Sequence, residues 1–187
     1  MLRIISGTAK GLRLHTPSQK KIRPTMNKVK ESLFNILQFR IEGCVFLDLF
    51  SGTGQIGIEA ASRGAKMVYL VEKYRDIINK NINRYKTASK GTCNIKLLNF
   101  DAIKFFDMFE KKVDIAFVDA PFNFRISQIF LNKLSKIINK NGLVVFETQY
   151  KDVAINKFDD FNLIKRYRYG RISLDFYSSL RAVYQTT

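Results

Sequence analysis

Five short apolar runs, separated by stretches of helical periodicity, constrain the fold of this chain more than any other feature of its sequence. Nearly uninterrupted apolar runs are typical of strands that are buried on both faces of a sheet. The sequence predicts strands at Val45–Phe50, Met67–Val71, Ile95–Leu98, Val113–Val118 and Leu143–Glu147. It predicts helices between them at Gln55–Arg63, Arg75–Thr87, Ala102–Glu110 and Ser127–Asn139. Repeated βα units of this kind indicate an α/β domain with a mostly parallel sheet and helices on both faces.

The two ends of the chain differ from this pattern. The tail is expected to form two more strands, Asn162–Tyr169 and Leu174–Tyr184, joined as an antiparallel hairpin. Near the N-terminus the sequence predicts a β-hairpin of two short strands, Leu2–Ser6 and Leu12–His15, and then a helix that begins near Pro24. We therefore expect a small arm, residues 1–40, that docks by an apolar helix face on a main domain, residues 41–187.

Basic residues outnumber acidic residues by 32 to 16, which gives a formal net charge of +16. The excess is concentrated in the arm, where nine basic residues accompany a single acidic one, Glu31. Basic side chains placed near phosphates release condensed counterions, so the charge favours binding to nucleic acid. Heavy use of lysine for solubility would also raise the charge, and the charge alone therefore favours nucleic acid only modestly.

Several other classes of protein are excluded by the sequence. The 187 residues hold no apolar run near the ~20 residues of a membrane-spanning helix, and the N-terminus lacks the features of a signal peptide. Cys44 and Cys93 lie far apart, and His15 is the one histidine, so neither a disulfide framework nor a metal site is expected. We expect a cytoplasmic protein that does not associate with membranes.

The strongest local motif is G-x-G-x-x-G at Gly52, Gly54 and Gly57, placed between a predicted strand and a helix. Glu72 follows at the tip of the next strand, where a carboxylate can accept hydrogen bonds from both hydroxyls of a ribose. This arrangement suits any cofactor that contains adenosine, so it leaves NAD and S-adenosylmethionine both open. A tight strand-to-helix turn without a ligand is the alternative.

Two further features favour S-adenosylmethionine. Asp48 lies in the first strand, where a carboxylate can bind the cationic α-amino group of a methionine moiety but would repel a pyrophosphate. The tetrapeptide Asp119–Phe122 follows the fourth strand, at the edge of the sheet where ligands bind in open α/β folds. A dehydrogenase has no evident use for such a tetrapeptide.

The residue types of this tetrapeptide suit methyl transfer to the exocyclic amine of a base. The Asp119 carboxylate and the Ala120 carbonyl can accept hydrogen bonds from the amine, which would expose the nitrogen lone pair. Phe122 offers a ring on which the base can stack, worth about 1–3 kcal/mol, and Pro121 stiffens the loop. Out of context, the tetrapeptide would be interpreted as an ordinary turn at the end of a strand.

Two weaker signals remain. Asp101, followed by Ala102, comes after the third strand, where its carboxylate can accept from an adenine amine or cap the following helix. The basic and aromatic stretch Lys165–Arg171 can contact RNA, or it can be the outward face of a tail strand.

The chain also resembles the RsmD family, bacterial methyltransferases that act on the exocyclic N2 of guanine in 16S ribosomal RNA. The resemblance covers essentially the whole chain and is carried by Arg3–Leu14, Arg23–Leu37, Phe50–Ala65, Asp119–Phe122 and Tyr169–Tyr177. The block that begins Arg23-Pro24-Thr25 is more specific than the glycine motif, because generic Rossmann-like methyltransferases lack it. One position departs from the family pattern, since Ala120 stands where the family usually has a proline.

The resemblance implies a Rossmann-like, seven-stranded methyltransferase domain with S-adenosylmethionine as donor and 16S ribosomal RNA, within the small subunit or an assembly intermediate, as acceptor. Together with the patterns above, it places the cofactor at Asp48, Phe50, Gly52, Gly54, Glu72, Lys73, Asp101 and Ala102. It places the target base at Asp119, Ala120, Pro121 and Phe122, and the RNA at Arg3, Arg13, Arg23, Thr25 and Lys28. We expect a monomer. The alternatives are an adenine-N6 methyltransferase of DNA or RNA, and a non-catalytic RNA-binding module with a vestigial cofactor pocket.

Overall fold

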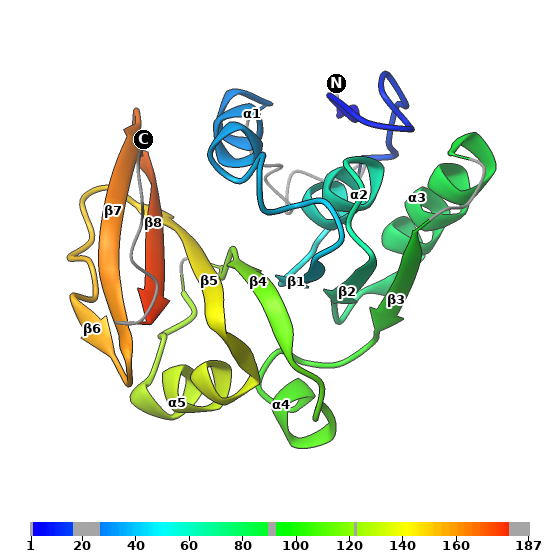
Figure 1. The fold of residues 1–187 in the computed structure, drawn as a ribbon. Helices are drawn as coiled ribbons and strands as arrows, with labels where there is room; N and C mark the ends of the chain where they lie inside the picture. Colours follow the sequence, from blue (N-terminus) through cyan, green and yellow to red (C-terminus); the bar gives the residue numbers. More distant parts are fainter. Residues whose placement is uncertain (1, 17–26, 90–92, 122, 180–187) are drawn as a thin grey trace.

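The structure is a computed structural model in which residues 2–16, 27–89, 93–121 and 123–179 are described. These residues form one sheet of eight strands in the order β3-β2-β1-β4-β5-β8-β7-β6. The strands are β1 (Val45–Leu49), β2 (Met67–Val71), β3 (Asn94–Leu98), β4 (Val113–Val118), β5 (Ile138–Gln149), β6 (Lys157–Phe158), β7 (Phe161–Tyr169) and β8 (Ile172–Ser179). Strands β1 to β5 are parallel to one another, and β8 pairs antiparallel with both β5 and β7 (Figure 1).

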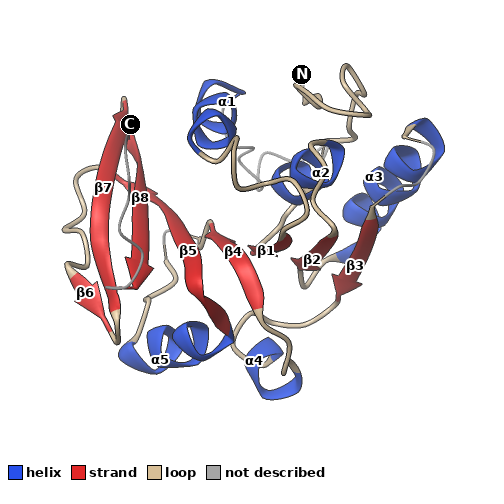
Figure 2. Ribbon diagram, in the orientation of Figure 1, coloured by secondary structure: helices blue, strands red, loops and turns tan. Residues whose placement is uncertain are grey.

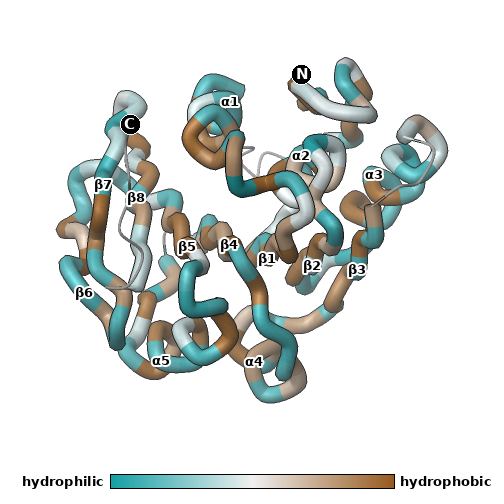
Figure 3. Tube along the Cα trace, viewed as in Figure 1, coloured by the Kyte–Doolittle hydropathy of each residue, from teal (hydrophilic) through white to brown (hydrophobic). Residues whose placement is uncertain are grey.

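Five helices cover the two faces of the sheet (Figure 2). They are α1 (Asn27–Ile36), α2 (Gln55–Ser62), α3 (Arg75–Ala88), α4 (Phe105–Met108) and α5 (Gln128–Ile137). Helices α1, α2 and α3 lie on one face, and α4 and α5 lie on the other (Figure 1). The apolar residues gather in the strands and on the helix sides that face the sheet (Figure 3). The expected mostly parallel α/β architecture with a C-terminal antiparallel hairpin is therefore confirmed.

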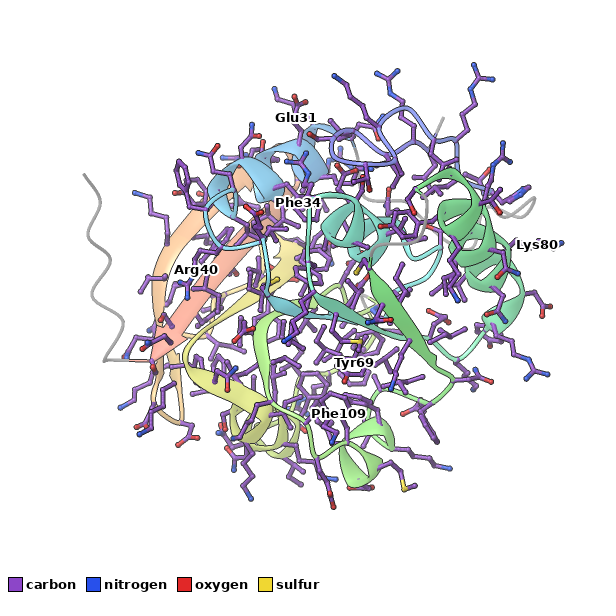
Figure 4. All side chains as sticks on the ribbon, turned by 45° about the vertical axis from the view of Figure 1, so that its right-hand side comes forward. Glu31, Phe34, Arg40, Tyr69, Lys80 and Phe109 are labelled. Carbon is purple, nitrogen blue, oxygen red and sulfur yellow. The ribbon has the colours of Figure 1, made fainter. Side chains whose placement is uncertain are left out.

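Two apolar clusters, one on each side of the sheet, form the core. On the arm side Phe34 of α1 packs on Phe46 of β1, with ring centroids 6.4 Å apart. On the other side Tyr69 of β2 meets Phe109 edge to face at 4.9 Å. Figure 4 shows Phe34 directed inward and Glu31 outward from the same helix, as the apolar stripe of that helix predicted.

The predicted elements match the observed ones best where they are buried. The bounds of β2 and β4 agree with the predicted ones. The predicted helix over 102–110 is wrong in length, because only the single turn of α4 is helical. The sheet contains eight strands where seven were expected, since the two-residue β6 adds to its edge. Pro24 and the end of the predicted last strand lie outside the described residues.

The predicted N-terminal hairpin is present as a short antiparallel pair, with a bridge between Arg3 and Arg13. The N–H of Ile4 donates to the Leu12 carbonyl and the N–H of Leu14 to the Leu2 carbonyl, each at 2.9 Å. The loop between the two segments packs against the end of α2. Gly7 has a φ of +84°, and a Cβ atom there would lie 1.7 Å from the carbonyl oxygen of Ser62. The hydroxyl of Ser62 donates to the Ser6 carbonyl at 2.6 Å and accepts from the Ala9 N–H at 2.9 Å. The N-terminal segment is thus fixed to the main domain by close backbone packing.

The arm is held by a buried cluster of charges that no pattern in the sequence indicates. Lys30, one of the nine basic residues of the arm, is fully buried. Its Nζ lies 3.1 Å from Oε2 of Glu59 and donates to the Arg3 carbonyl at 2.6 Å. Glu59 also accepts the N–H groups of Ile5 at 2.8 Å and Ser6 at 2.9 Å. This carboxylate therefore joins the N-terminal segment, α1 and α2.

No helix within the described ranges is long and apolar enough to cross a membrane. Cys44 and Cys93 are both buried free thiols, and burial raises their pKa values to about 12 and about 11.

Candidate active site

The carboxyl ends of β1, β2 and β4 bring the predicted site residues together. Leu49 pairs with Val71 of β2 on one side and with Val118 of β4 on the other. Glu72 and Asp119, the next residues of those two strands, therefore flank the chain where it leaves β1 and enters the glycine loop. Both carboxylates act electrostatically on Asp48. Residues separated by as many as 71 positions in the sequence thus form one acidic edge.

Asp48 is buried, with a side chain 1% exposed. Its Oδ2 accepts the N–H of Gly57, in the first turn of α2, at 2.9 Å. Burial raises the pKa of Asp48 to about 8, and the neighbouring carboxylates of Asp119 and Glu72 act in the same direction, against the Gly57 hydrogen bond. A buried carboxylate in this environment is stabilised by a cation, and the α-ammonium group of a methionine moiety is one.

Gly57 is required at this point by close packing. A Cβ atom on it would lie 2.1 Å from Cδ2 of Leu70 and 3.3 Å from Oδ2 of Asp48. The glycine therefore lets α2 approach the sheet closely enough for its N–H to reach Asp48. The third glycine of the motif serves this approach of helix to strand, as the spacing of the motif suggests.

Glu72 is held by the backbone on both sides. Its Oε2 accepts the Gly52 N–H at 2.8 Å and its Oε1 accepts the Tyr74 N–H at 2.9 Å. A carboxylate offers about four acceptor positions, so two backbone bonds leave capacity for the hydroxyls of a ribose. The residue predicted to bind ribose therefore lies directly beside the glycine loop.

Asn99, which no sequence motif indicated, fixes the position of Glu72. The Asn99 side-chain amide donates to the carbonyls of Glu72 at 2.9 Å and Lys73 at 2.7 Å. It thereby ties the end of β3 to the end of β2. Lys73 itself is exposed, with its Nζ 5.9 Å from the centroid of the Tyr74 ring.

Asp101 and Ala102 follow β3 at the same edge. Asp101 is exposed, and its Oδ1 accepts the Ile103 N–H at 3.0 Å. This bond caps the turn before α4, one of the two roles that the sequence left open. The second oxygen of the carboxylate can still accept from an adenine amine, and Ala102 is buried beneath it.

The loop after β4 is supported by aromatic rings. Phe50 has a φ of +62°, which is uncommon for a residue with a side chain and points to local strain at the end of β1. Its ring meets Phe124 edge to face at 4.9 Å and lies 6.4 Å from Phe130. Ala120 packs on the same cluster, whereas Phe122 lies outside the described residues. Phe50, predicted to contact the cofactor, thus contacts Phe124, two residues after the tetrapeptide that was predicted to hold the base.

The predicted RNA-binding residues lie on the arm. Arg3 and Arg13 face each other across the antiparallel bridge, and both are exposed. Like charges placed directly opposite are destabilising, and an anionic ligand would relieve their repulsion. Lys28 is exposed at the start of α1. Arg23 and Thr25 lie outside the described residues.

A second missed residue, Asn81 of α3, connects the arm to the glycine loop. It is fully buried. Its Oδ1 accepts the His15 N–H at 2.7 Å, and its Nδ2 donates to the carbonyls of His15 at 3.1 Å and Thr53 at 2.9 Å. Because Thr53 stands between Gly52 and Gly54, one side chain sets the distance between the end of the described arm segment and the candidate cofactor site.

Residues 2–178 match the model of a family described as "Conserved hypothetical protein 95". The chain belongs to this family, the RsmD family. A curated relative from Haemophilus influenzae, ribosomal RNA small subunit methyltransferase D, is 30% identical over 182 residues, which are 95% of this chain and 94% of the relative.

Solved structures agree with this membership. A putative methyltransferase from Escherichia coli superposes with a TM-score of 0.81 at 26% identity, over 95% of this RsmD family chain and 97% of that one. A more distant putative methyltransferase, complexed with SAH, gives a TM-score of 0.67 at 16% identity, over 83% of this chain and 50% of that one. At such low identity the second likeness shows the fold alone.

Proposed function

We propose that this protein transfers a methyl group from S-adenosylmethionine to the exocyclic N2 of a guanine in small-subunit ribosomal RNA. The observation that carries the proposal is the position of the Asp119–Pro121 loop, one strand away from Asp48 and the glycine loop. Membership of the RsmD family and a relative named as a small-subunit ribosomal RNA methyltransferase support methyl transfer to ribosomal RNA. The choice of guanine N2 rests on the chemistry of the loop and on the family resemblance.

The residues at the carboxyl edge fit S-adenosylmethionine. Asp48 is a buried carboxylate whose charged neighbours in the described structure are themselves carboxylates, which suits the cationic methionine end of the cofactor. Glu72 would hold the ribose hydroxyls, and Asp101 would accept from the adenine amine. When bound, the cofactor supplies a methyl group already activated by its sulfonium. Positioning by the protein would therefore supply most of the catalysis.

The loop after β4 would prepare the amine. The nitrogen of an exocyclic amine is a poor nucleophile, because its lone pair is delocalised into the ring. The Asp119 carboxylate and the Ala120 carbonyl would accept the two N–H bonds, favour a pyramidal nitrogen and expose its lone pair. The Phe50–Phe124 contact, which follows this loop in the chain, would support it although Ala120 replaces the usual proline.

The RNA would reach the loop as a flipped-out guanine, since a stacked base cannot enter such a site. The arm would bind the phosphates around it through Arg3, Arg13 and Lys28, with Arg23 and Thr25 at the junction with the site. We propose that the protein acts as a monomer in the cytoplasm, on 16S ribosomal RNA in the small subunit or an assembly intermediate.

Replacement of Asp119 tests this mechanism. We expect Asp119→Ala to lower the rate of methyl transfer at least 10²- to 10³-fold, because it removes an acceptor that acts on the reacting amine. Asp119→Asn keeps an oxygen acceptor without the charge, so its rate of methyl transfer should lie between those of the wild type and Asp119→Ala. Calorimetry should find S-adenosylmethionine affinity nearly unchanged in both variants. Full transfer activity in Asp119→Ala would contradict the assignment.

The identity of the methylated base separates guanine N2 from adenine N6. Digested 16S ribosomal RNA from a strain without the gene should lack one N2-methylguanosine, and the purified protein should restore it. Mass spectrometry distinguishes that product from N6-methyladenosine, whose appearance would favour the adenine alternative. Absence of S-adenosylmethionine binding would favour a non-catalytic RNA-binding module.

A further inference from the structure

The tip of the β7–β8 hairpin lies at the same edge of the sheet as the candidate active site. Strand β5 runs parallel to β4, and its last residue, Gln149, pairs with Ile172, the first residue of β8. The N–H of Tyr150 then donates to the Arg171 carbonyl at 2.9 Å. The chain that leaves β5 is thereby joined to the hairpin tip (Figure 1). With strands ~4.8 Å apart, β7 lies roughly 15 Å from β4.

A buried ion pair organises this tip. Asp175 of β8 is 1% exposed, and its Oδ1 lies 3.1 Å from Nε of Arg166. Arg166 also donates to the Asp152 carbonyl at 2.9 Å and to the Ser173 hydroxyl at 3.0 Å. A buried ion pair of this kind is weak evidence for stability but well suited to fixing a geometry. Here it fixes the segment after β5 against the hairpin.

Above this pair, Tyr150 supports an exposed arginine. The Tyr150 ring lies 5.2 Å from the guanidinium carbon of Arg166 and 4.2 Å from that of Arg168. Nε of Arg168 donates to the Gly170 carbonyl at 3.1 Å. The stacked ring and this bond hold the guanidinium of Arg168 in one orientation, while the residue itself is exposed. The terminal nitrogens of a fork held in this way can bind a phosphate with two hydrogen bonds.

We propose that Arg168, held by Tyr150 and supported by exposed Arg171, binds the phosphate backbone of the RNA substrate. This surface is the Arg168 platform. Arg168 pairs with Ser173 across the hairpin, so the two side chains share one face of the sheet. Ser173 alternates along β8 with Leu174, which belongs to the arm-side core. The platform therefore lies on the opposite face of the sheet from α1. The RNA would then be held from both faces of the sheet, by the arm on one side and by the Arg168 platform on the other, with the target base between them. The inference rests on the proposed RNA substrate.

The platform differs from the aromatic contact that the sequence left open. Tyr167 and Tyr169 pack against the arm-side core, so they are not the exposed stacking surface of the stretch Lys165–Arg171. The exposed ring is Tyr150, 40% accessible, from the segment after β5. The proposed contact with RNA therefore depends on Arg168 and on Tyr150, which holds it and lies outside the stretch Lys165–Arg171.

Charge reversal at two positions of the antiparallel strands β6 to β8, one at each edge of the sheet, tests the proposal. Arg168→Glu changes the platform, whereas Lys157→Glu makes the same change of charge at exposed β6, which pairs near the start of β7 at the opposite edge. Binding is measured by fluorescence anisotropy over a range of salt concentrations. The probes are small subunits, and 16S ribosomal RNA extracted from them, from a strain without the gene.

We expect Arg168→Glu to weaken RNA binding about tenfold and to reduce the salt slope by about one, with Lys157→Glu within twofold of wild type. Arg168→Lys should lose part of the RNA affinity, because lysine keeps the charge but not the forked guanidinium group. Tyr150→Ala should lose a similar part of the RNA affinity. Equal effects of Arg168→Glu and Lys157→Glu on both probes would overturn the inference. Wild-type protein that binds RNA but methylates no guanine amine would instead overturn the proposed function and leave the comparison of variants valid.

Discussion

Two buried carboxylates, Glu59 within α2 and Asp48 in the neighbouring strand β1, have opposite surroundings. Glu59 is fully buried and is compensated by Lys30 at 3.1 Å and by Nε of Arg63 at 2.9 Å. Asp48 is 1% exposed, accepts the N–H of Gly57, and is raised in pKa to about 8 by burial and by Asp119 and Glu72. One acid is neutralised within the fold. The other is left with acidic neighbours at the edge where a cationic ligand is proposed to bind.

The difference separates a structural charge from a binding charge. A buried carboxylate that is completed by its own chain gains nothing from a ligand, and its replacement should affect the folded state first. A buried carboxylate whose described charged neighbours are acidic is protonated more readily and destabilises the folded state when ionised. Its replacement should affect ligand binding first.

The largest effect is expected from Glu59→Ala. This change leaves the Lys30 ammonium buried without its carboxylate and the N–H groups of Ile5 and Ser6 without their acceptor. Removal of one partner from a buried ion pair typically costs about 3–5 kcal/mol. Denaturant unfolding should show a loss of that size, together with faster proteolysis of the N-terminal segment.

A double variant sharpens this test. Lys30→Met with Glu59→Gln removes both charges and keeps an amide oxygen for the backbone N–H groups. It should recover at least half of the stability that Glu59→Ala loses. If the single and double variants unfold alike, the unpaired Lys30 ammonium is not the source of the cost.

The same contrast explains what the sequence could and could not predict. Strands β2 and β4 are nearly uninterrupted apolar runs, so their composition and length define them. Glu72 and Asp119 directly follow these strands, and Asp48 lies near the end of β1, so their positions could be predicted. Nothing in the sequence distinguishes Glu59 from an ordinary polar residue of a helix. Its partners are Lys30 and the N–H groups of Ile5 and Ser6, more than 25 residues away, and no local pattern announces them.

Asn81 and Asn99 escaped prediction for a related reason. Both bind backbone carbonyls of distant segments, and such bonds depend on the tertiary fold and not on residue type at a fixed spacing. The packing of the N-terminal hairpin also escaped prediction, because no sequence pattern reveals that Gly7 lies against Ser62. A buried asparagine on the core face of a helix, as at Asn81, is the one signal that could have been used.

Compared with Glu59→Ala, Asp48→Asn is expected to affect the stability of the fold less and the binding of S-adenosylmethionine more. The asparagine keeps an oxygen for the Gly57 N–H but removes the charge. Loss of a charge-assisted hydrogen bond of about 1.5–3 kcal/mol should weaken S-adenosylmethionine binding about 10- to 100-fold by calorimetry. Wild-type affinity in this variant would place the methionine ammonium elsewhere.

Asp48→Asn should also remove a pH-dependent cost. The folded pKa of Asp48, about 8, lies above the value of ~3.9 for an unfolded chain. The folded state therefore holds a proton that the unfolded state has lost, and the stability contributed by this group falls as pH rises from about 4 to about 8. In thermal denaturation the variant should match wild type near pH 4 and exceed it at pH 9.

The smallest effect is the pH dependence of cofactor affinity itself. Below pH 8 Asp48 is mostly protonated in the free protein, so binding of a cationic group must release its proton, and affinity should fall about tenfold between pH 8 and pH 6.5. Above pH 8 the free cofactor loses its own α-amino proton, whose pKa is about 8. Affinity should therefore be greatest near pH 8. Calorimetry at pH 7 in buffers of different ionisation enthalpy should detect about one proton released.

5′-Methylthioadenosine provides the matched ligand, since it has the adenosine part but lacks the α-amino group. Its affinity should vary little between pH 6.5 and pH 8, because Glu72 and Asp101 meet the adenosine whether or not Asp48 is ionised. The Asp48→Asn variant should remove the loss at low pH for S-adenosylmethionine while keeping the loss above pH 8. A low-pH loss of equal size with both ligands would assign the proton to a group at the adenosine end, and Asp48 would then be a buried acid without the binding role that distinguishes it from Glu59.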